Sequence, residues 1–150
     1  MSESPSHLIV REHAFDELDG RLLYEILRLR SEIFVVEQTC IYLDLDRIDY
    51  RARHLTIEEN GELVAAARWF DGPEGLTLGR IVTRSDRRGR GHGKRLVREA
   101  LARIGDVDVV MHAQAHLERF YRELGFAVEG LPFLEDGIPH LHMVRRRIGR

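Results

Sequence analysis

The segment "RRGRGHGKRL", residues 87–96, places Gly89, Gly91 and Gly93 at every second position among basic side chains. Glycine lets a backbone curl and approach a ligand closely, because it has no Cβ. An apolar helical pattern begins immediately afterwards, and the first turn of a helix presents unpaired N–H groups and the positive end of the helix dipole. This combination predicts a turn that binds a phosphate group.

The register of the glycines excludes two common phosphate-binding motifs. A P-loop requires glycine where Arg88 stands and Ser or Thr where Arg95 stands. A dinucleotide fingerprint requires glycine at Lys94 and a repeated βαβ unit. The pattern that fits is R-x-x-G-x-G, formed by Arg88, Gly91 and Gly93. The alternative is a solvated basic turn at the start of a helix.

This pattern, placed after the strand-like "GRIVT", resembles the acyl-CoA-binding motif of the GNAT family of N-acetyltransferases. Three further stretches resemble the ElaA-like branch of that family: "LRLRSEIFVVEQTCIYLDLD", "QAHLERFYRELGF" and "EDGIPHLHM". Together with the glycine-rich turn they are spread over most of the chain. The resemblance implies an α/β fold with an α+β mixed sheet, in which helices flank a central, mostly antiparallel twisted sheet.

The resemblance also implies where acetyl-CoA, the cosubstrate, would lie. Its pantetheine would pair with the backbone of the "RIVT" strand, and its pyrophosphate would rest on amides of residues 88–94. The implied cofactor-binding residues are Ile81, Val82, Thr83, Arg88, Gly89, Arg90, Gly91, His92, Gly93, Lys94, Gln114 and Tyr121. Two positions depart from the family pattern, because Gln114 stands where many members have Asn and Leu117 where many have Ala.

Acetyl transfer to an amine requires a neutral nitrogen, a stabilised oxyanion and a proton for the leaving thiolate. At pH 7 a lysine-like amine is neutral in only about one molecule in ~10³, a deficit of about 4 to 5 kcal/mol, so a base or a desolvating site is needed. Tyr121 precedes "RELGF" as the family's tyrosine does, which implies that it is the acid. The alternative is a core aromatic beside Phe120. A backbone N–H near Val82 is expected to stabilise the oxyanion.

Glu37 and His140 are the candidates for the general base, because the resemblance puts both of their segments near the acceptor pocket. Each could equally be an ordinary side chain, Glu37 at a helix end and His140 beside a turn. Arg30 begins the family's R-x-x-x-F pattern and is expected to orient the acidic loop that follows it. Three aspartates of that loop either attract a cationic acceptor or form a solvated face: Asp44, Asp46 and Asp49.

Histidine and cysteine spacing predicts no metal site. His112 and His116 are four residues apart but fall on a strand and a helix, His140 and His142 are two apart, and Cys40 is the single cysteine. Cys40 has no evident histidine partner, so we expect direct attack by the amine rather than a covalent intermediate. The lack of disulfides, and of a secretory signal in "MSESPSHLIV", predicts a cytoplasmic protein.

Periodicity and turn signals predict the elements that position these groups. In chain order they are a strand over 7–13, a helix from Asp19 to Glu37, an acidic loop with one short helical turn over 38–52, a hairpin of 53–59 and 62–70 around Asn60-Gly61, a strand over 76–83, a helix ending before Gly105, a strand over 107–113, a helix over 114–124 and two strands over 126–133 and 140–147. The second long helix carries the apolar stripe Leu96, Val97, Ala100, Leu101 and Ile104.

Composition supports one domain over residues 1–150, with 43% hydrophobic and 32% charged residues and no apolar run long enough for a membrane span. The net charge is −2, although residues 84–103 hold eight Lys or Arg against two acidic residues. Binding of nucleic acid by this segment ranks last among the hypotheses, because the segment has no aromatic residues for base stacking.

The sequence therefore predicts an N-acetyltransferase that transfers the acetyl group of acetyl-CoA to a primary amine in a ternary complex. The alternative is a non-catalytic module of the same fold that binds or senses acyl-CoA. The expected partners are acetyl-CoA and an amine on a small molecule, peptide or protein, with no nucleic acid, no membrane and no metal. A homodimer is left open, as is the identity of the acceptor.

Overall fold

The computed structural model describes residues 7–149, so residues 1–6, on which the prediction about a secretory signal partly rests, lie outside the described residues. The strands are β1 (Leu8–Ala14), β2 (Arg53–Glu59), β3 (Glu62–Gly72), β4 (Gly75–Thr83), β5 (Val109–Gln114), β6 (Ala127–Val128), β7 (Phe133–Glu135) and β8 (Ile138–Arg145). The helices are α1 (Gly20–Arg30), α2 (His92–Ile104) and α3 (Glu118–Glu123). No helix within residues 7–149 has the length and apolar character needed to cross a lipid bilayer.

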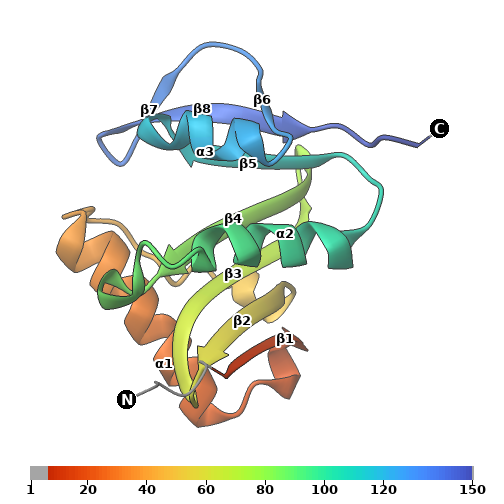
Figure 1. Cartoon of the computed structure of the whole chain (residues 1–150). Helices are drawn as coiled ribbons and strands as arrows, with labels where there is room; N and C mark the ends of the chain where they lie inside the picture. The colour runs from red at the N-terminus through yellow and green to blue at the C-terminus, as the bar shows by residue number, and fades with distance from the viewer. Residues whose placement is uncertain (1–6, 150) are drawn as a thin grey trace, which may run out of the picture.

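One twisted sheet holds all the strands, in the order β1-β2-β3-β4-β5-β8-β6, with β7 also paired to β8 (Figure 1). Neighbouring strands run antiparallel except for β4 and β5, which are parallel. The hairpin at Asn60-Gly61 forms as predicted, with both turn residues at positive φ. The expectation of a mixed, mostly antiparallel sheet is confirmed.

The segment after α3 differs from the prediction of a single strand over 126–133. It forms two short strands, β6 and β7, which pair in succession with β8. Gly130 between them has a φ of +81°, and Pro132 has no N–H to donate to a ladder. These two residues interrupt the pairing, so the prediction of one continuous strand was wrong.

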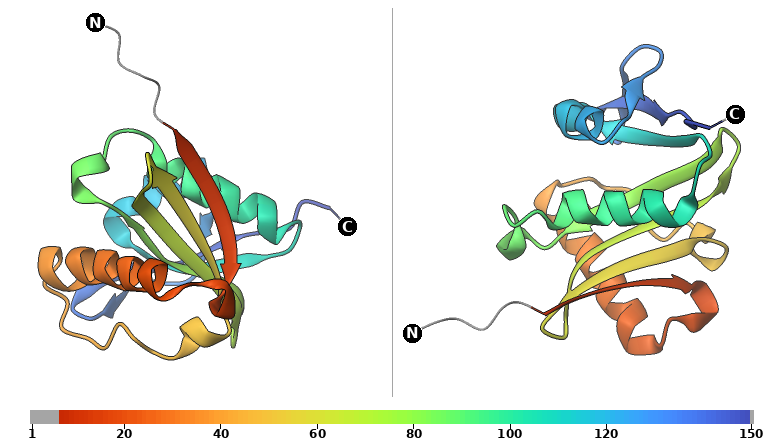
Figure 2. Two further views of the ribbon diagram at one scale, coloured as in Figure 1. Left: turned by 90° about the horizontal axis from the view of Figure 1, so that it is seen from below. Right: turned by 45° about the vertical axis from the view of Figure 1, so that its right-hand side comes forward.

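The helices cover the two faces of the sheet (Figure 2). On one face α2 and α3 enclose the larger core, which includes Leu96, Val97, Ala100 and Leu101 of the predicted apolar stripe. On the other face α1 packs through Ile26 and Leu29 against Ala66 of β3 and Val82 of β4. Because α1 contacts the central strands, no helix within residues 7–149 covers that side of β5 and β8.

Strand β4 bends at a bulge and then separates from β5. The register runs from Arg68↔Gly79 to Ala66↔Val82, so β4 has one more residue than β3 over this stretch. Arg80, within the bulge, has a left-handed φ of +49°. A bulge bends its strand, and the β4–β5 ladder is limited to Leu76↔Val109 and Thr77↔Val110. The two strands therefore diverge toward the C-terminal end of β4 (Figure 1).

Helix α1 begins at the predicted cap, where the Asp19 carboxylate accepts a hydrogen bond from Leu22 N (2.7 Å). It continues beyond Arg30 as a π-helical segment, Ser31–Glu37, in which Gln38 N donates to Ile33 O (3.0 Å). The helical region therefore ends at Glu37, as predicted. The wider π turns carry the chain to the opening between β4 and β5.

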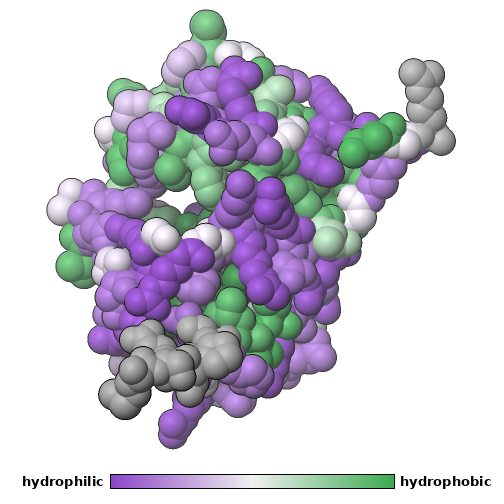
Figure 3. Space-filling model, viewed as in Figure 1, coloured by the Kyte–Doolittle hydropathy of each residue, from purple (hydrophilic) through white to green (hydrophobic). Residues whose placement is uncertain are grey.

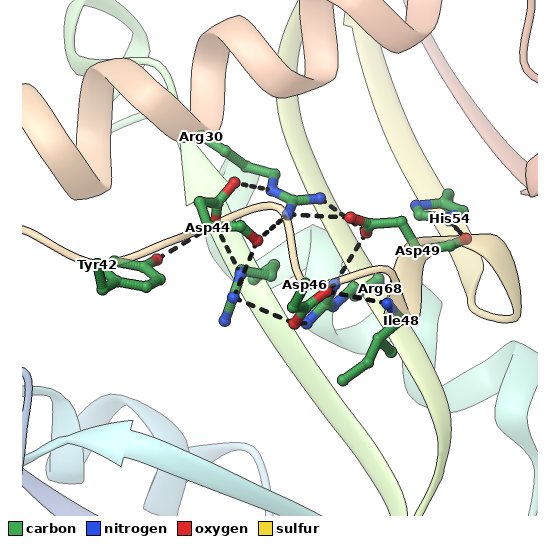
Figure 4. A network of polar contacts seen from close by, with 9 residues as sticks. Arg30, Tyr42, Asp44, Asp46, Ile48, Asp49, His54 and Arg68 are labelled. Carbon is green, nitrogen blue, oxygen red and sulfur yellow. Dashed lines mark hydrogen bonds and ion pairs between the residues drawn. The ribbon is translucent and has the colours of Figure 1, made fainter.

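A buried network of arginines and aspartates ties the acidic loop to α1 and to the sheet (Figure 4). Arg30, 2% exposed, donates to Asp44 Oδ2 (2.9 Å) and Asp49 Oδ1 (2.8 Å). Arg68 of β3 donates to Asp49 Oδ1 (2.9 Å) and to Asp46 (2.6 Å). The expectation that Arg30 orients this loop is confirmed. The aspartates are neither a solvated face nor free to attract a cation.

The third arginine of the network is Arg80 at the bulge. Its Nε lies 2.7 Å from Asp44 Oδ1, and its Nη2 lies 3.3 Å from Asp46 Oδ2. Its guanidinium also lies over the ring of Tyr42, 5.3 Å from the ring centroid, which is within the range of a cation–π contact. The loop thus holds the side chain of the residue at which β4 bends.

The network makes stability depend on pH. Burial opposes ionisation of Asp46, but hydrogen bonds and charge from Arg68 outweigh it and lower the pKa of Asp46 to about 2. Burial likewise opposes ionisation of Asp49, and Arg30 and Arg68 outweigh it and lower the pKa of that carboxyl as well. A depressed carboxyl pKa stabilises the fold above the unfolded-state pKa, and this contribution is lost as pH falls through the folded-state pKa.

We therefore expect Asp46→Asn to lower the free energy of unfolding at pH 7 by about 2 to 4 kcal/mol, because Arg68 and Arg80 each lose one of their carboxylate partners in a largely buried network. The difference from the unmodified protein should shrink as pH falls from about 4 toward 2, as the native carboxylate is protonated. Urea unfolding at a series of pH values measures this. Asp16→Asn, at an exposed carboxyl, is the control, and a difference that stays constant with pH would contradict the argument.

Candidate functional site

A cavity of about 820 Å³ lies where β4 and β5 separate. Figure 3 shows the surface hollowed between the upper and lower parts of the molecule at this level. The predicted site residues that line it are Glu37, Ile81, Val82, Thr83, Arg88, Gly89, Gly91, His92, Gly93, Lys94, Gln114, Tyr121 and His140. The fold therefore brings together segments that are up to a hundred residues apart in the chain.

One wall of the cavity is the edge of β4. Ile81, Val82 and Thr83 line it after the ladder with β5 has ended. On its other edge β4 still pairs with β3, as Ala66↔Val82 and Ala65↔Thr83. Within residues 7–149, the β5-facing edge of this stretch has no strand partner. Backbone N–H and C=O groups there can pair with an extended ligand, as a further strand would.

The glycine-rich turn forms the end of the cavity next to that strand. Gly89 and Gly91 adopt left-handed φ values of +79° and +81°, and Gly91 is the N-cap of α2 without a side-chain hydrogen bond. The first turn of α2 has no acidic residue. A Cβ on Gly93 would lie 3.6 Å from Thr83 Oγ1 and 3.7 Å from Phe120 Cζ, which both line the cavity. The helix N-terminus therefore opens onto the cavity, with the geometry of an anion-binding site.

The buried carboxylate of Glu59 anchors the turn from behind. Arg87 Nε donates to Glu59 Oε1 (3.1 Å), Arg90 Nη1 donates to the same oxygen (3.4 Å), and His92 Nε2 lies 3.7 Å from Oε2. Arg90 was predicted as a cofactor contact, but its guanidinium is turned to Glu59. Within the described chain, the cations of this turn that line the cavity without contacting Glu59 are Arg88 and Lys94.

Tyr121 of α3 lies on the opposite side of the cavity from β4. Its side chain is buried, and its ring packs edge-on to Phe120 (5.1 Å between centroids) and to Phe126 (6.0 Å). Burial raises the pKa of Tyr121 to about 12. The phenol is therefore protonated at neutral pH. It is a core aromatic that also lines the cavity, and its role as the acid stays a prediction.

The two candidate bases have different surroundings. Glu37, half-exposed at the end of the π segment, accepts a hydrogen bond from Arg88 (2.6 Å) through Oε1. His140 is buried, and its Nδ1 lies 2.7 Å from the carbonyl oxygen of Ile138. A carbonyl oxygen only accepts, so Nδ1 carries the hydrogen and the lone pair of the neutral ring is on Nε2. That atom lies 3.5 Å from Glu135 Oε2.

Sequence reasoning missed several residues of this cavity. Glu135 lies between His140 and His112, whose Nδ1 is 3.2 Å from Glu135 Oε1. The hydrogen bond between them, favoured by their opposite charges, raises the pKa of His112 and lowers that of Glu135. Gln38 also lines the wall, where its Oε1 accepts from Gln114 Nε2 (2.8 Å) across the opening. No spacing along the chain indicates these pairs, because each joins two separate elements.

Cys40 is unsuited to nucleophilic attack in this arrangement. Its side chain is buried, and burial together with the nearby Asp136 carboxylate raises the pKa of the thiol. A raised pKa lowers the fraction of thiolate, which is the reactive form.

Comparison with known proteins is consistent with this geometry. A family model described as Acetyltransferase (GNAT) domain matches residues 35–147. A UPF0039 protein of Mycobacterium tuberculosis is 43% identical over 141 residues, with 89% of this chain and 90% of that protein covered. Protein ElaA of Escherichia coli K12 is 39% identical over 141 residues, with 88% and 92% covered.

The chain belongs to the GNAT family. Within it the chain is ElaA-like, because the crystal structure of Escherichia coli ElaA superposes with a TM-score of 0.87 over 93% of this chain and 100% of that one, at 34% identity. An acyl-CoA N-acyltransferase from Pseudomonas aeruginosa superposes with a TM-score of 0.86 at 38% identity, covering 93% and 99%. The GNAT fold and these neighbours support acyl transfer as the general activity.

Because Gly89 and Gly91 have left-handed φ values, a Cβ at either position strains the turn. We expect Gly89→Ala and Gly91→Ala each to lower the free energy of unfolding by about 1 to 2 kcal/mol. Gly20→Ala, at the first position of α1 with open space around its Cβ and no positive φ, should be neutral or slightly stabilising. Thermal unfolding of the three variants tests this, and equal melting temperatures for all three would contradict the turn geometry.

Proposed function

We propose that this GNAT protein is an acetyl-CoA-dependent N-acetyltransferase that acts on a primary amine by direct attack in a ternary complex. The observation that carries the proposal is the single cavity that joins an anion-binding helix N-terminus, an unpaired strand edge, a protonated tyrosine and a histidine with an outward lone pair. These are the parts needed to hold a thioester donor and to manage two proton transfers.

The donor would lie along β4. In the proposed complex the pantetheine pairs with the free backbone edge of Ile81, Val82 and Thr83, and the pyrophosphate binds the amides at the start of α2. Arg88 and Lys94 add charge at that point. The Arg88–Glu37 pair is solvent-exposed, and exposed ion pairs contribute about 0 to 1 kcal/mol. A pyrophosphate can therefore replace Glu37 as the partner of Arg88 at little cost. A CoA complex of an aminoglycoside 6'-N-acetyltransferase, 18% identical with a TM-score of 0.72, shares the fold.

His140 is the better supported general base. Its Nε2 lone pair is available to take a proton from the amine, and the nearby Glu135 carboxylate would stabilise the imidazolium that results. Glu37 is instead bound to Arg88. The neutral amine would then attack the thioester carbon while a backbone N–H near Val82 stabilises the oxyanion. Collapse breaks the C–S bond and expels the CoA thiolate, which takes its proton from Tyr121. The second proton, which the attacking nitrogen loses as it becomes the amide nitrogen, restores the phenol of Tyr121.

The acceptor end of the cavity supports an amine substrate. Glu135 and Asp136 of the β7–β8 turn line it, and these carboxylates replace the loop aspartates as the groups that would attract a cationic acceptor. The loop aspartates themselves are bound to Arg30, Arg68 and Arg80. This distribution of charge favours acceptance of a protonated amine, which must then lose its proton within the cavity.

The test begins with donor binding and release of free CoA across a panel of small amines and peptides. Acetyl-CoA should stabilise the protein by about 2.7 kcal/mol at a hundredfold excess over Kd. Tyr121→Phe should keep this stabilisation but reduce kcat by about 10²- to 10⁴-fold, since the leaving thiolate loses its proton donor. Tyr24→Phe, at an exposed tyrosine of α1, is the matched control.

The alternative, a module that only senses acyl-CoA, predicts acetyl-CoA stabilisation with no amine-dependent release of CoA in either variant. Nucleic-acid binding by the basic segment has little support, because its arginines pair with carboxylates, for example Arg84 with Asp86 and Arg103 with Glu99. Absence of both stabilisation and CoA release would overturn the proposed function.

The base assignment makes a separate prediction. His140→Gln should reduce kcat/KM by about 10²- to 10⁴-fold, because it removes the Nε2 lone pair to which we assign the proton transfer. Glu37→Gln should reduce it by less than about tenfold, since it removes only an exposed ion pair. Steady-state kinetics with acetyl-CoA and the best amine of the panel decides between the two. A larger loss for Glu37→Gln than for His140→Gln would reverse the assignment.

A further inference from the structure

Two histidines face each other on the side of the sheet that α1 leaves uncovered. His112 of β5 and His142 of β8 are direct cross-strand partners, with ring centroids 5.7 Å apart. Their sequence neighbours Met111 and Met143 point the other way, into the core under α2 and α3. The two histidines are thirty residues apart in the chain, and the register of β5 and β8 brings them together.

A carboxylate from a third element completes the group. Glu74, in the turn between β3 and β4, lies with Oε1 3.1 Å from His112 Nε2 and with Oε2 3.1 Å from His142 Nε2. The three ligand atoms all lie within 4.8 Å of one another. In a tetrahedral zinc site with bonds of about 2.0 to 2.1 Å, ligand atoms are separated by about 3.3 to 3.4 Å. The two nitrogen–oxygen distances are therefore close to those of a metal site, and the two histidine nitrogens lie within 4.8 Å of each other.

The hydrogen bonds around the group favour a cation at its centre. Glu135 accepts from Nδ1 of His112, which leaves Nε2 directed at Glu74. A carboxylate that fixes the second nitrogen in this way is the usual outer partner of a metal-bound histidine. His142 Nε2 is buried and has no hydrogen bond of acceptable geometry within residues 7–149, although it lies near the Glu74 carboxylate. A metal ion would provide that atom with a partner.

We propose that Nε2 of His112, Nε2 of His142 and the carboxylate of Glu74 bind a divalent transition metal, best Zn²⁺. Two histidines, one carboxylate and a fourth position open to water form a common zinc ligand set. The site is separate from the donor end of the cavity, and the proposal does not depend on the proposed function. Nothing in the acetyl-transfer chemistry above requires the ion.

Binding would join two parts of the sheet that are linked by a short ladder of strand pairing. Glu74 belongs to the β3–β4 side, while His112 and His142 belong to β5 and β8, and within residues 7–149 the strand pairing between the two sides is the short β4–β5 ladder. An ion that binds the folded state and not the unfolded chain stabilises by mass action. The metal would therefore act as a clamp beside the opening, at the wall to which His112 contributes.

The test uses the full chain, stripped of metal with a chelator and dialysed at pH 7.5. Calorimetric titration with Zn²⁺ should give one site per chain, and thermal unfolding should shift upward with zinc. Co²⁺, used as a spectroscopic probe, should give the intense visible absorption of a tetrahedral site. His142→Gln and Glu74→Gln should each lose both the calorimetric signal and the thermal shift. Glu74 is half-exposed on a turn, so its variant is expected to fold normally.

Two further variants sharpen the result. Glu135→Gln should weaken zinc binding by about 10- to 100-fold without abolishing it, as expected for a group that orients a ligand. His7→Gln, at an exposed histidine away from the cluster, should bind zinc as the unmodified protein does. The proposal would be overturned by the absence of zinc binding, or by zinc binding that survives in Glu74→Gln and His142→Gln or is lost in His7→Gln.

Discussion

The buried contacts between Arg30, Arg68 and Arg80 and the loop aspartates are the constraint on which the rest of the structure depends. They connect the end of α1, the middle of β3 and the bulge of β4 through one irregular segment. Charges of both signs are removed from water there, which is favourable only because each is paired and hydrogen-bonded. With the bulge held in place β4 bends away from β5, and the cavity is the space that results.

One end of this cavity is lined mainly by backbone groups and the other mainly by side chains. The end that we propose for the donor consists mainly of backbone, namely the β4 edge and the amides of α2, and it needs glycine more than any functional side chain. The acceptor end consists of side chains from four elements: the π segment, β5, the β7–β8 turn and β8. A backbone site fits a common cosubstrate in any member of the family, whereas a side-chain site is specific to an individual acceptor.

This difference explains how much could be predicted from the sequence. The elements and the glycine-rich turn follow from local signals, namely the apolar stripe of α2, Asn60-Gly61 and the cap at Asp19. The split of the late segment at Gly130 was missed, because a two-residue strand has no periodicity. Some partners belong to separate elements, such as His112 with His142 and Gln38 with Gln114. Their contacts depend on strand register and on the divergence of β4 from β5. Spacing along the chain indicates neither.

The positive charge of residues 84–103 likewise has a different meaning in the fold than in the sequence. Residues 84–103 carry a large local excess of positive charge in the sequence, yet in the fold most of these arginines meet a carboxylate from the same or a neighbouring element. Glu59, distant in sequence and buried behind the turn, contacts Arg87 and Arg90. The turn therefore presents to the cavity chiefly its amides, Lys94 and the exchangeable Arg88. In the proposed complex an anion there would be recognised by the direction of backbone N–H groups more than by net charge, which would favour a compact pyrophosphate over an extended polyanion.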